Sequence, residues 1–198
     1  MTADPREIDD LIRQAKISYE ADQYAECIRL CEVLLQNSQP LSRTRVTALY
    51  LLGDVYIDLE QFREAIRIYD MLIANENNDI VYANRGFAYM SLGNWNSALR
   101  EYLAAIQSNP NNVIAVKFAA ECYMALGNNA AAISLILKII STKSDNGALH
   151  RTIGLAYSRS EQWIEAYKAF SRAISLDPND EISITAKNQI EKLANGRG

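Results

Sequence analysis

The sequence contains little of the chemistry that catalysis and metal binding need. Its 198 residues include one histidine, His150, and three cysteines, Cys27, Cys31 and Cys122. An odd number of cysteines without a pairing pattern fits a reducing compartment. It has no Gly-rich phosphate loop, no Gly-x-Ser-x-Gly motif and no Cys-x-x-Cys pair. Because a single histidine cannot build a metal centre or a base–nucleophile pair, we expect no enzyme, no metal site and no cofactor.

Long apolar runs and strong charge are also absent. No run approaches the ~18 apolar residues that would indicate a membrane span, so we expect no membrane insertion. The first residues lack the basic start and apolar core of a secretory signal, which favours a cytoplasmic location. The formal net charge of −4 gives no strong positive field, and this argues against nucleic-acid binding.

An internal repeat is the main feature that the sequence does contain. A glycine is followed three residues later by a tyrosine, then nine residues later by an alanine, then four residues later by an aromatic residue. The three clearest copies are Gly53, Tyr56, Ala65 and Tyr69; Gly86, Tyr89, Ala98 and Tyr102; and Gly154, Tyr157, Ala166 and Phe170. Two of them close with Asn109-Pro110 and Asp177-Pro178. Self-similarity on such a period indicates a stacked repeat architecture.

This pattern resembles the tetratricopeptide repeat, whose period is about 34 residues. The resemblance implies an all-α fold, a right-handed superhelical α-solenoid of helix-turn-helix repeats closed by a C-terminal capping helix. It places a single array over residues 1–198, with repeats at 8–41, 46–78, 79–112, 113–146 and 147–180. The first and fourth copies are degenerate. Helical periodicity agrees, because Ala98, Leu99, Tyr102, Ala105 and Ile106 fall on one helix face.

The small residues of the repeat predict how each hairpin packs. A glycine or alanine where two helices cross lets their backbones approach closely, and the aromatic residues fill the space beside that contact. Cys27 and Cys31 occupy slots that normally hold alanine and an aromatic residue, so we favour buried packing for them over metal or redox use. His150 lies in a first helix, where we favour a structural or groove-surface role.

The last helix is predicted to cap the stack, since a hairpin array needs an end with a polar outer face. Residues 181–194 contain the apolar positions Ile182, Ala186, Ile190 and Leu193, which we expect to pack as one stripe. The charged residues between them would face water.

The resemblance also implies where a partner would bind. In the family the first helices of successive repeats line a concave groove, and its contacts come from a fixed set of slots. These slots hold Tyr50, Leu51, Asp54 and Ile57; Ala83, Asn84, Phe87 and Met90; Lys117, Phe118, Glu121 and Met124; and Arg151, Thr152, Leu155 and Arg159. The predicted groove is more apolar than charged.

Family members that bind the C-terminal tails of Hsp70 and Hsp90 use a carboxylate clamp. The clamp has lysine and asparagine in one repeat, asparagine in the next, and lysine and arginine in the third. No three consecutive repeats reproduce it here. The central triplet, for example, has Tyr50 and Asp54, then Asn84, then Ile114 and Phe118. This route to a chaperone tail is therefore disfavoured.

The sequence thus favours a non-catalytic protein–protein interaction module, an adaptor, scaffold or co-chaperone-like protein. We expect Phe87, Met90, Phe118 and Met124, flanked by Tyr50 and Leu155, to hold a peptide or helix through apolar anchors. The alternative for each residue is packing inside the array. Two other functions stay open, a self-assembling homo-oligomeric scaffold and an accessory subunit of a secretion or enzyme complex.

Overall fold

The protein is built from helices. The computed structural model describes residues 5–39, 42–73, 78–141 and 145–195. Within those residues it has eleven α-helices and no strand, which confirms the predicted all-α class. The chain divides into two compact units, Met1–Asn94 and Trp95–Gly198, which are described separately below as unit 1 and unit 2.

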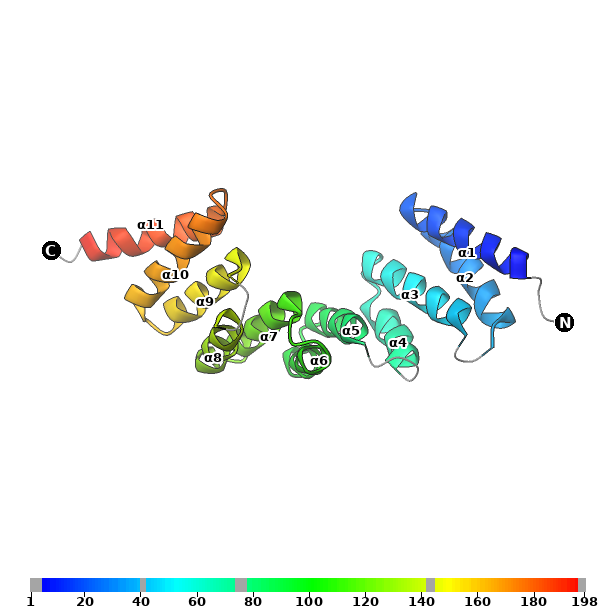
Figure 1. The fold of residues 1–198 in the computed structure, drawn as a ribbon, viewed down its shortest axis with the longest axis horizontal. Coiled ribbons are helices and arrows are strands. Elements are labelled where there is room, and N and C mark those ends of the chain that lie inside the picture. The colour runs from blue at the N-terminus through cyan, green and yellow to red at the C-terminus, as the bar shows by residue number, and fades with distance from the viewer. Residues whose placement is uncertain (1–4, 40–41, 74–77, 142–144, 196–198) are drawn as a thin grey trace. The chain divides into compact units, whose positions relative to one another are not determined.

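Unit 1 consists of two helical hairpins and one further helix (Figure 1). Its helices are α1 (Pro5–Glu20), α2 (Tyr24–Asn37), α3 (Arg43–Asp58), α4 (Phe62–Ile73) and α5 (Asp79–Ser91). Each helix packs on the next, and α1 also packs on α3. The first helices of the first two repeats, α1 and α3, therefore lie against one another.

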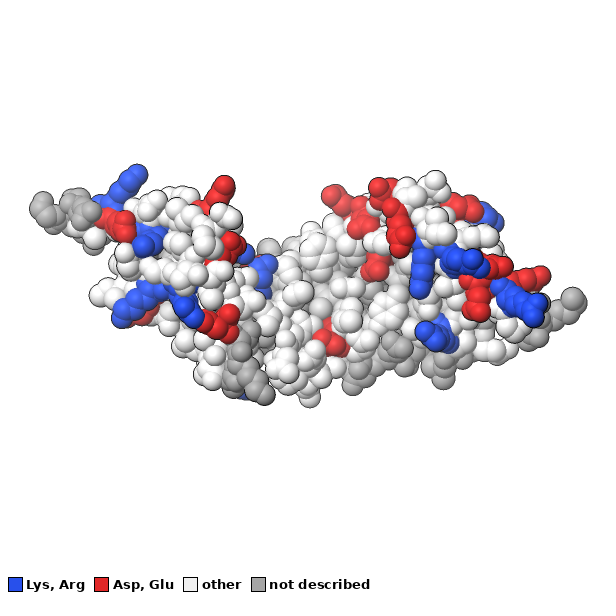
Figure 2. All heavy atoms as spheres, turned by 45° about the horizontal axis from the view of Figure 1, so that its top comes forward, with Lys and Arg blue, Asp and Glu red and all other residues white. Residues whose placement is uncertain are grey.

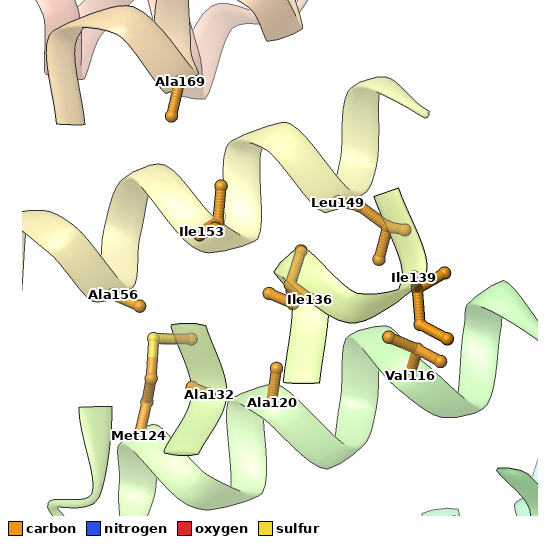
Figure 3. Packing of buried hydrophobic residues seen from close by; sticks show 10 residues of the cluster. All are labelled: Val116, Ala120, Met124, Ala132, Ile136, Ile139, Leu149, Ile153, Ala156 and Ala169. Atoms are coloured by element: carbon orange, nitrogen blue, oxygen red, sulfur yellow. The ribbon is translucent and has the colours of Figure 1, made fainter. Parts of the chain in front are cut away.

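Unit 2 follows the same plan. Its helices are α6 (Trp95–Ser108), α7 (Val113–Ala125), α8 (Asn129–Ile140), α9 (Gly147–Arg159), α10 (Trp163–Leu176) and α11 (Glu181–Asn195). Consecutive helices pack on one another, and α9 also contacts α7 and α11. Figure 3 shows α7, α8, α9 and α10 meeting over one cluster of buried apolar side chains, which includes Val116, Ile136 and Ile153.

Asparagine side chains begin several helices. Asn78, Asn112, Asn128 and Asn146 stand before α5, α7, α8 and α9, and each side-chain oxygen accepts a hydrogen bond from a backbone N–H of the first turn. Such caps satisfy N–H groups that have no partner inside the helix.

The tight turns inside the hairpins share one backbone geometry. Each has one residue in the left-handed region, with φ between 55° and 79°, namely Asp22, Glu60, Gly93, Gly127 and Glu161. The residue after it donates its N–H to the carbonyl five residues earlier, at 2.8–3.0 Å. This pattern closes a helix C-terminus by satisfying its last carbonyls. Only the two glycines adopt the left-handed region without steric strain.

Two glycines of the repeat, Gly53 and Gly154, contact aromatic rings, which differs from the expected contact between two backbones. A Cβ atom placed on Gly53 would lie 2.6 Å from Cε1 of Tyr69, and one on Gly154 would lie 2.7 Å from Cε1 of Phe170. Both rings are completely buried. The glycine therefore makes room for the aromatic side chain of the second helix, because a ring is wider than the gap that a Cβ atom would leave.

The capping helix α11 is present, but its predicted apolar stripe is wrong in part. Ile182 and Leu193 are 56% and 50% exposed, whereas Ser183 is completely buried. The hydroxyl of Ser183 donates to Oδ2 of Asp180 at 2.8 Å, and its backbone N–H donates to Oδ1 of the same carboxylate at 3.3 Å. This polar cap turns Ser183 inward and thereby rotates Ile182 toward solvent.

Candidate partner-binding site

The first helices of unit 1 carry the predicted groove residues of this unit. Tyr50, Leu51, Asp54 and Ile57 lie on α3, and Ala83, Asn84, Phe87 and Met90 lie on α5. Leu51 is buried in an apolar cluster, so for this residue the alternative of internal packing holds. The hydroxyl of Tyr50 accepts a hydrogen bond from Nδ2 of Asn78 at 3.0 Å.

A pocket of about 110 Å³ brings four of the predicted residues together, namely Asp54, Ile57, Asn84 and Phe87. Four helices contribute to it, because α1, α3, α4 and α5 all supply side chains. Its lining is Tyr19, Asp54, Ile57, Asp58, Tyr69, Asn84 and Phe87. Every lining residue belongs to unit 1, so the pocket is complete within that unit. We call it the acidic pocket.

Tyr19, Asp58 and Tyr69 were not among the groove residues predicted from the sequence. Asp58 lies one turn after Asp54 on α3, and this i, i+4 spacing was the available signal that both carboxylates share a helix face. Tyr69 comes from a second helix and reaches the pocket because its ring passes over Gly53. Sequence slots taken from first helices alone could not find it.

The charges in the acidic pocket are poorly compensated. Burial and then the charge of Asp58 raise the pKa of Asp54, while a hydrogen bond from Tyr69 opposes that shift. That bond is long, with the Tyr69 hydroxyl 3.5 Å from Oδ1 of Asp54. Burial, followed by hydrogen bonding to Asp58, raises the pKa of Tyr19. Among the described residues, no ion pair includes Asp54 or Asp58.

One side of the acidic pocket is apolar. Phe87 is 36% exposed although it is a large aromatic side chain. Its ring meets the Phe62 ring edge-on, with 6.3 Å between the ring centroids. Phe62 therefore holds the Phe87 ring in place, and Ile57 of α3 completes the apolar lining.

In unit 2, the slot that Asp54 occupies in unit 1 holds Glu121 of α7. The ammonium of Lys117, one turn earlier on α7, lies 3.4 Å from Oε1 of Glu121. The same ammonium lies 4.0 Å from the centroid of the Phe118 ring. A lysine of the chain itself thus neutralises this carboxylate and contacts an aromatic face.

The other predicted residues of unit 2 are used mainly in packing. Phe118 stacks on Tyr102 with 5.5 Å between ring centroids. Met124 is 7% exposed and lies in the apolar cluster of Figure 3, against which Leu155 also packs. Thr152 is buried, and its hydroxyl donates to the carbonyl of Ala148 at 2.8 Å. The half-buried residues of the predicted surface in this unit are Lys117, Phe118, Glu121, Arg151 and Leu155.

Arg151 takes part in the contact between α9 and α11. Its guanidinium lies 3.0 Å from Oδ1 of Asp180, a buried carboxylate. Burial raises the pKa of Asp180, but hydrogen bonds from Ser183 and Arg151 outweigh it and lower the pKa overall. Arg151 therefore has a structural partner. Arg159, the last predicted residue, is exposed.

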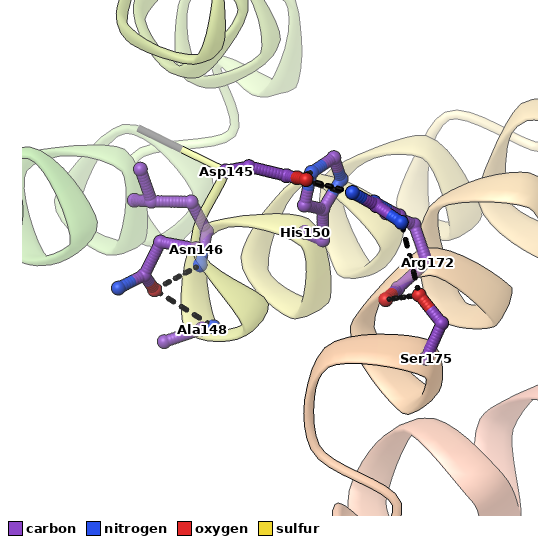
Figure 4. A network of polar contacts seen from close by, with 7 residues as sticks. Asp145, Asn146, Ala148, His150, Arg172 and Ser175 are labelled. Carbon is purple, nitrogen blue, oxygen red and sulfur yellow. Dashed lines mark hydrogen bonds and ion pairs between the residues drawn. The ribbon is translucent and has the colours of Figure 1, made fainter. Parts of the chain in front are cut away.

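His150 and the cysteines take structural positions. Figure 4 shows His150 and Arg172 around Asp145; Nε2 of His150 lies 2.8 Å from Oδ1 of Asp145, and Arg172 pairs with both carboxylate oxygens. Cys27 and Cys31 are buried, as their repeat slots predict. Within the described part of the chain, no group of three or more potential ligands could hold a metal ion.

A second, apolar cavity lies between α10 and α11 of unit 2. Its volume is about 540 Å³, and its lining is Trp163, Ile164, Tyr167, Lys168, Ile190, Glu191 and Ala194. Trp163 and Ile164 are 38% and 68% exposed. The hydroxyl of Tyr167 donates to Oε1 of Glu191 at 3.0 Å across the cavity lining. We call it the α10–α11 groove.

Comparison with protein families gives a consistent result. Three models, each described as tetratricopeptide repeat, match residues 48–80, 83–148 and 147–180. The chain belongs to the tetratricopeptide repeat (TPR) family. The matched ranges lie within residues 48–180.

Relatives and solved structures agree with the TPR fold. The DnaJ homolog subfamily C member 3 of Mus musculus is 26% identical over 107 residues, 54% of this chain and 21% of that protein. Its counterpart in Rattus norvegicus is 24% identical over 151 residues, 76% of this chain and 28% of that protein. The crystal structure of YrrB, a TPR protein with an unusual peptide-binding site, superposes with a TM-score of 0.74 at 20% identity and covers 90% of both chains.

Membership of the TPR family supports a protein–protein interaction module with protein partners. The family is typically non-catalytic. No helix within the described residues is long and apolar enough to cross a membrane. On the face seen in Figure 2, basic and acidic side chains are interspersed in both units, which does not resemble the basic patch of a nucleic-acid binder.

Proposed function

We propose that this TPR chain is a non-catalytic adaptor that binds a segment of a protein partner on its first helices. The observation that carries the proposal is the acidic pocket, where α3 and α5 place Asp54, Asn84 and the exposed ring of Phe87 around one cavity. Exposed aromatic side chains beside polar groups are typical of sites that bind peptides. The similarity to YrrB, a TPR protein with a peptide-binding site, agrees with it.

The proposal also keeps the array, the apolar anchors and the partner class that the sequence predicts. The five repeats would form one array, with Phe87, Met90 and Phe118 as apolar anchors for the partner. The cytoplasmic location stays a prediction. A partner that ends in a carboxylate, as chaperone tails do, is disfavoured, because Asp54 and Asp58 would repel it.

The proposal can be tested by capturing partners with the purified chain and identifying them by mass spectrometry. The variant carrying Phe87→Ala and Phe118→Ala is expected to lose most captured partners. Leu103→Ala is the matched control, because Leu103 is also 36% exposed but lies on a second helix, α6. Circular dichroism establishes that each variant is folded. Unchanged capture by the folded double variant would refute binding on the first helices.

A homo-oligomeric scaffold is the second candidate, and the α10–α11 groove favours it. The groove exposes Trp163 and Ile164, and apolar surface of this kind can bury against a second copy. Sedimentation equilibrium of the chain and of Ile164→Lys tests it. Self-association that the substitution abolishes would support the scaffold, whereas a monomer at all concentrations would exclude it.

A further inference from the structure

The acidic pocket has the features of a site for a positively charged side chain. Two carboxylates, those of Asp54 and Asp58, reach it from successive turns of α3. Tyr19, Tyr69 and Asn84 add oxygen atoms that can accept hydrogen bonds from an ammonium or guanidinium group. Phe87 and Ile57 offer apolar surface for the aliphatic part of such a side chain.

Unit 2 shows which group pairs with a carboxylate in the repeat slot of Asp54. Glu121 of unit 2, which occupies the same slot as Asp54, is paired with Lys117 at 3.4 Å. The Lys117 ammonium also contacts an aromatic ring, that of Phe118. In unit 1 the position equivalent to Lys117 is Tyr50, which carries no positive charge. Asp54 therefore lacks the lysine that its counterpart has, although an exposed aromatic ring, Phe87, stands beside it.

We propose that the acidic pocket binds a lysine or arginine side chain of the partner segment. The charged end would lie between Asp54 and Asp58, and the methylene groups would lie against Phe87 and Ile57. The partner then supplies to unit 1 the cation that Lys117 supplies within unit 2. This inference rests on the proposed function, because it names the anchor by which the bound segment is recognised.

The test titrates the full chain with three small probes and follows its backbone amide signals by NMR. The probes are the N-acetyl methylamides of lysine, arginine and norleucine; norleucine has a similar aliphatic chain without charge. Saturable shifts in α3 and α5 are expected with lysine or arginine, and affinity for norleucine is expected to be at least tenfold weaker. Charge-assisted hydrogen bonds in a partly buried site are strong enough for that difference.

Three variants make the test specific. Asp54→Asn removes one carboxylate and is expected to weaken binding of the cationic probes about tenfold. Tyr50→Lys places a lysine at the position equivalent to Lys117, and its ammonium is expected to occupy the pocket and to weaken binding of the cationic probes to the same extent. Glu32→Gln, which removes an exposed carboxylate on α2, is the charge-matched control and is expected to bind as the unchanged chain does.

Equal responses to all three probes, or unchanged binding in both folded pocket variants, would overturn the inference. Partner capture that still depends on Phe87 and Phe118 in that case would leave the proposed function standing. If cation binding is unchanged in the two pocket variants and partner capture is unchanged in the chain with Phe87→Ala and Phe118→Ala, both the inference and the proposed function are refuted.

Discussion

The contact between Gly154 and the Phe170 ring gives the sharpest prediction about stability. In Gly154→Ala the added Cβ atom would lie 2.7 Å, 2.8 Å and 3.0 Å from Cε1, Cδ1 and Cζ of Phe170. The ring is completely buried, so it can move only if its neighbours in α9 and α10 move too. Such overpacking costs about 1–3 kcal/mol, and the higher helix propensity of alanine returns up to about 1 kcal/mol. We therefore expect a net loss of about 1–2 kcal/mol.

Urea unfolding followed by circular dichroism measures this loss. Gly147→Ala is the matched control on the same helix, because its Cβ atom would meet Cβ of Leu176 at 3.5 Å, an ordinary contact. It should change stability by less than about 0.5 kcal/mol. Adding Phe170→Leu should make the Gly154→Ala substitution less costly than it is beside phenylalanine. A Gly154→Ala chain as stable as the unchanged protein would refute the account of ring packing over glycine.

Three further predictions follow from single residues. Gly127→Ala should lower the unfolding free energy by about 1 kcal/mol in urea, because Gly127 has φ +79° and its Cβ atom would meet nothing within 4 Å, so the cost is purely one of backbone conformation. Asp180→Asn should cost about 1–3 kcal/mol at pH 7, by loss of the pairing with Arg151 and Ser183. The folded state lowers the pKa of Asp180, so the stability that its carboxylate contributes is present above the ordinary pKa of 3.8 and is lost as the pH falls through the folded pKa. Melting temperatures measured against pH should show this loss in the unchanged chain and not in Asp180→Asn. The folded state raises the pKa of Asp54, so ionisation of this carboxyl group destabilises the fold above the folded pKa and has no effect below 3.8. The Asp54→Asn chain should therefore have a higher melting temperature than the unchanged chain at pH 7 and the same melting temperature at low pH. A lower melting temperature at pH 7 would contradict this.

The repeat pattern was enough to predict the helices and most of the core. Ala65, Ala98, Ala132 and Ala166 are all completely buried, as their shared slot indicates. Periodic spacing predicts such positions well because burial repeats with the helix face.

Other features depend on local geometry that the residue types alone do not predict. Glu60 and Glu161 adopt the left-handed turn conformation only because the hairpin imposes it, and glutamate does not favour it. Ser183 replaces Ile182 on the buried face of α11 because Asp180 binds it.

The acidic pocket could be predicted only in part. Asp54, Asn84 and Phe87 lay in slots implied by the family resemblance, and the structure places them around one cavity. Tyr69 joins them because Gly53 lets its ring cross beneath the first helix, a contact between residues 16 positions apart. The need of Asp54 for an external cation follows from its difference from Glu121, which is paired with Lys117 of the same helix.

Photo-crosslinking from the pocket tests the central claim most directly. Benzoyl-phenylalanine is placed at position 87, or at position 103 on α6 as the control of equal exposure, and the crosslinked peptides are identified by mass spectrometry. Crosslinks to partner segments are expected from position 87 alone, with a lysine or arginine near the crosslinked residue. Crosslinks from position 103 with none from position 87 would contradict it.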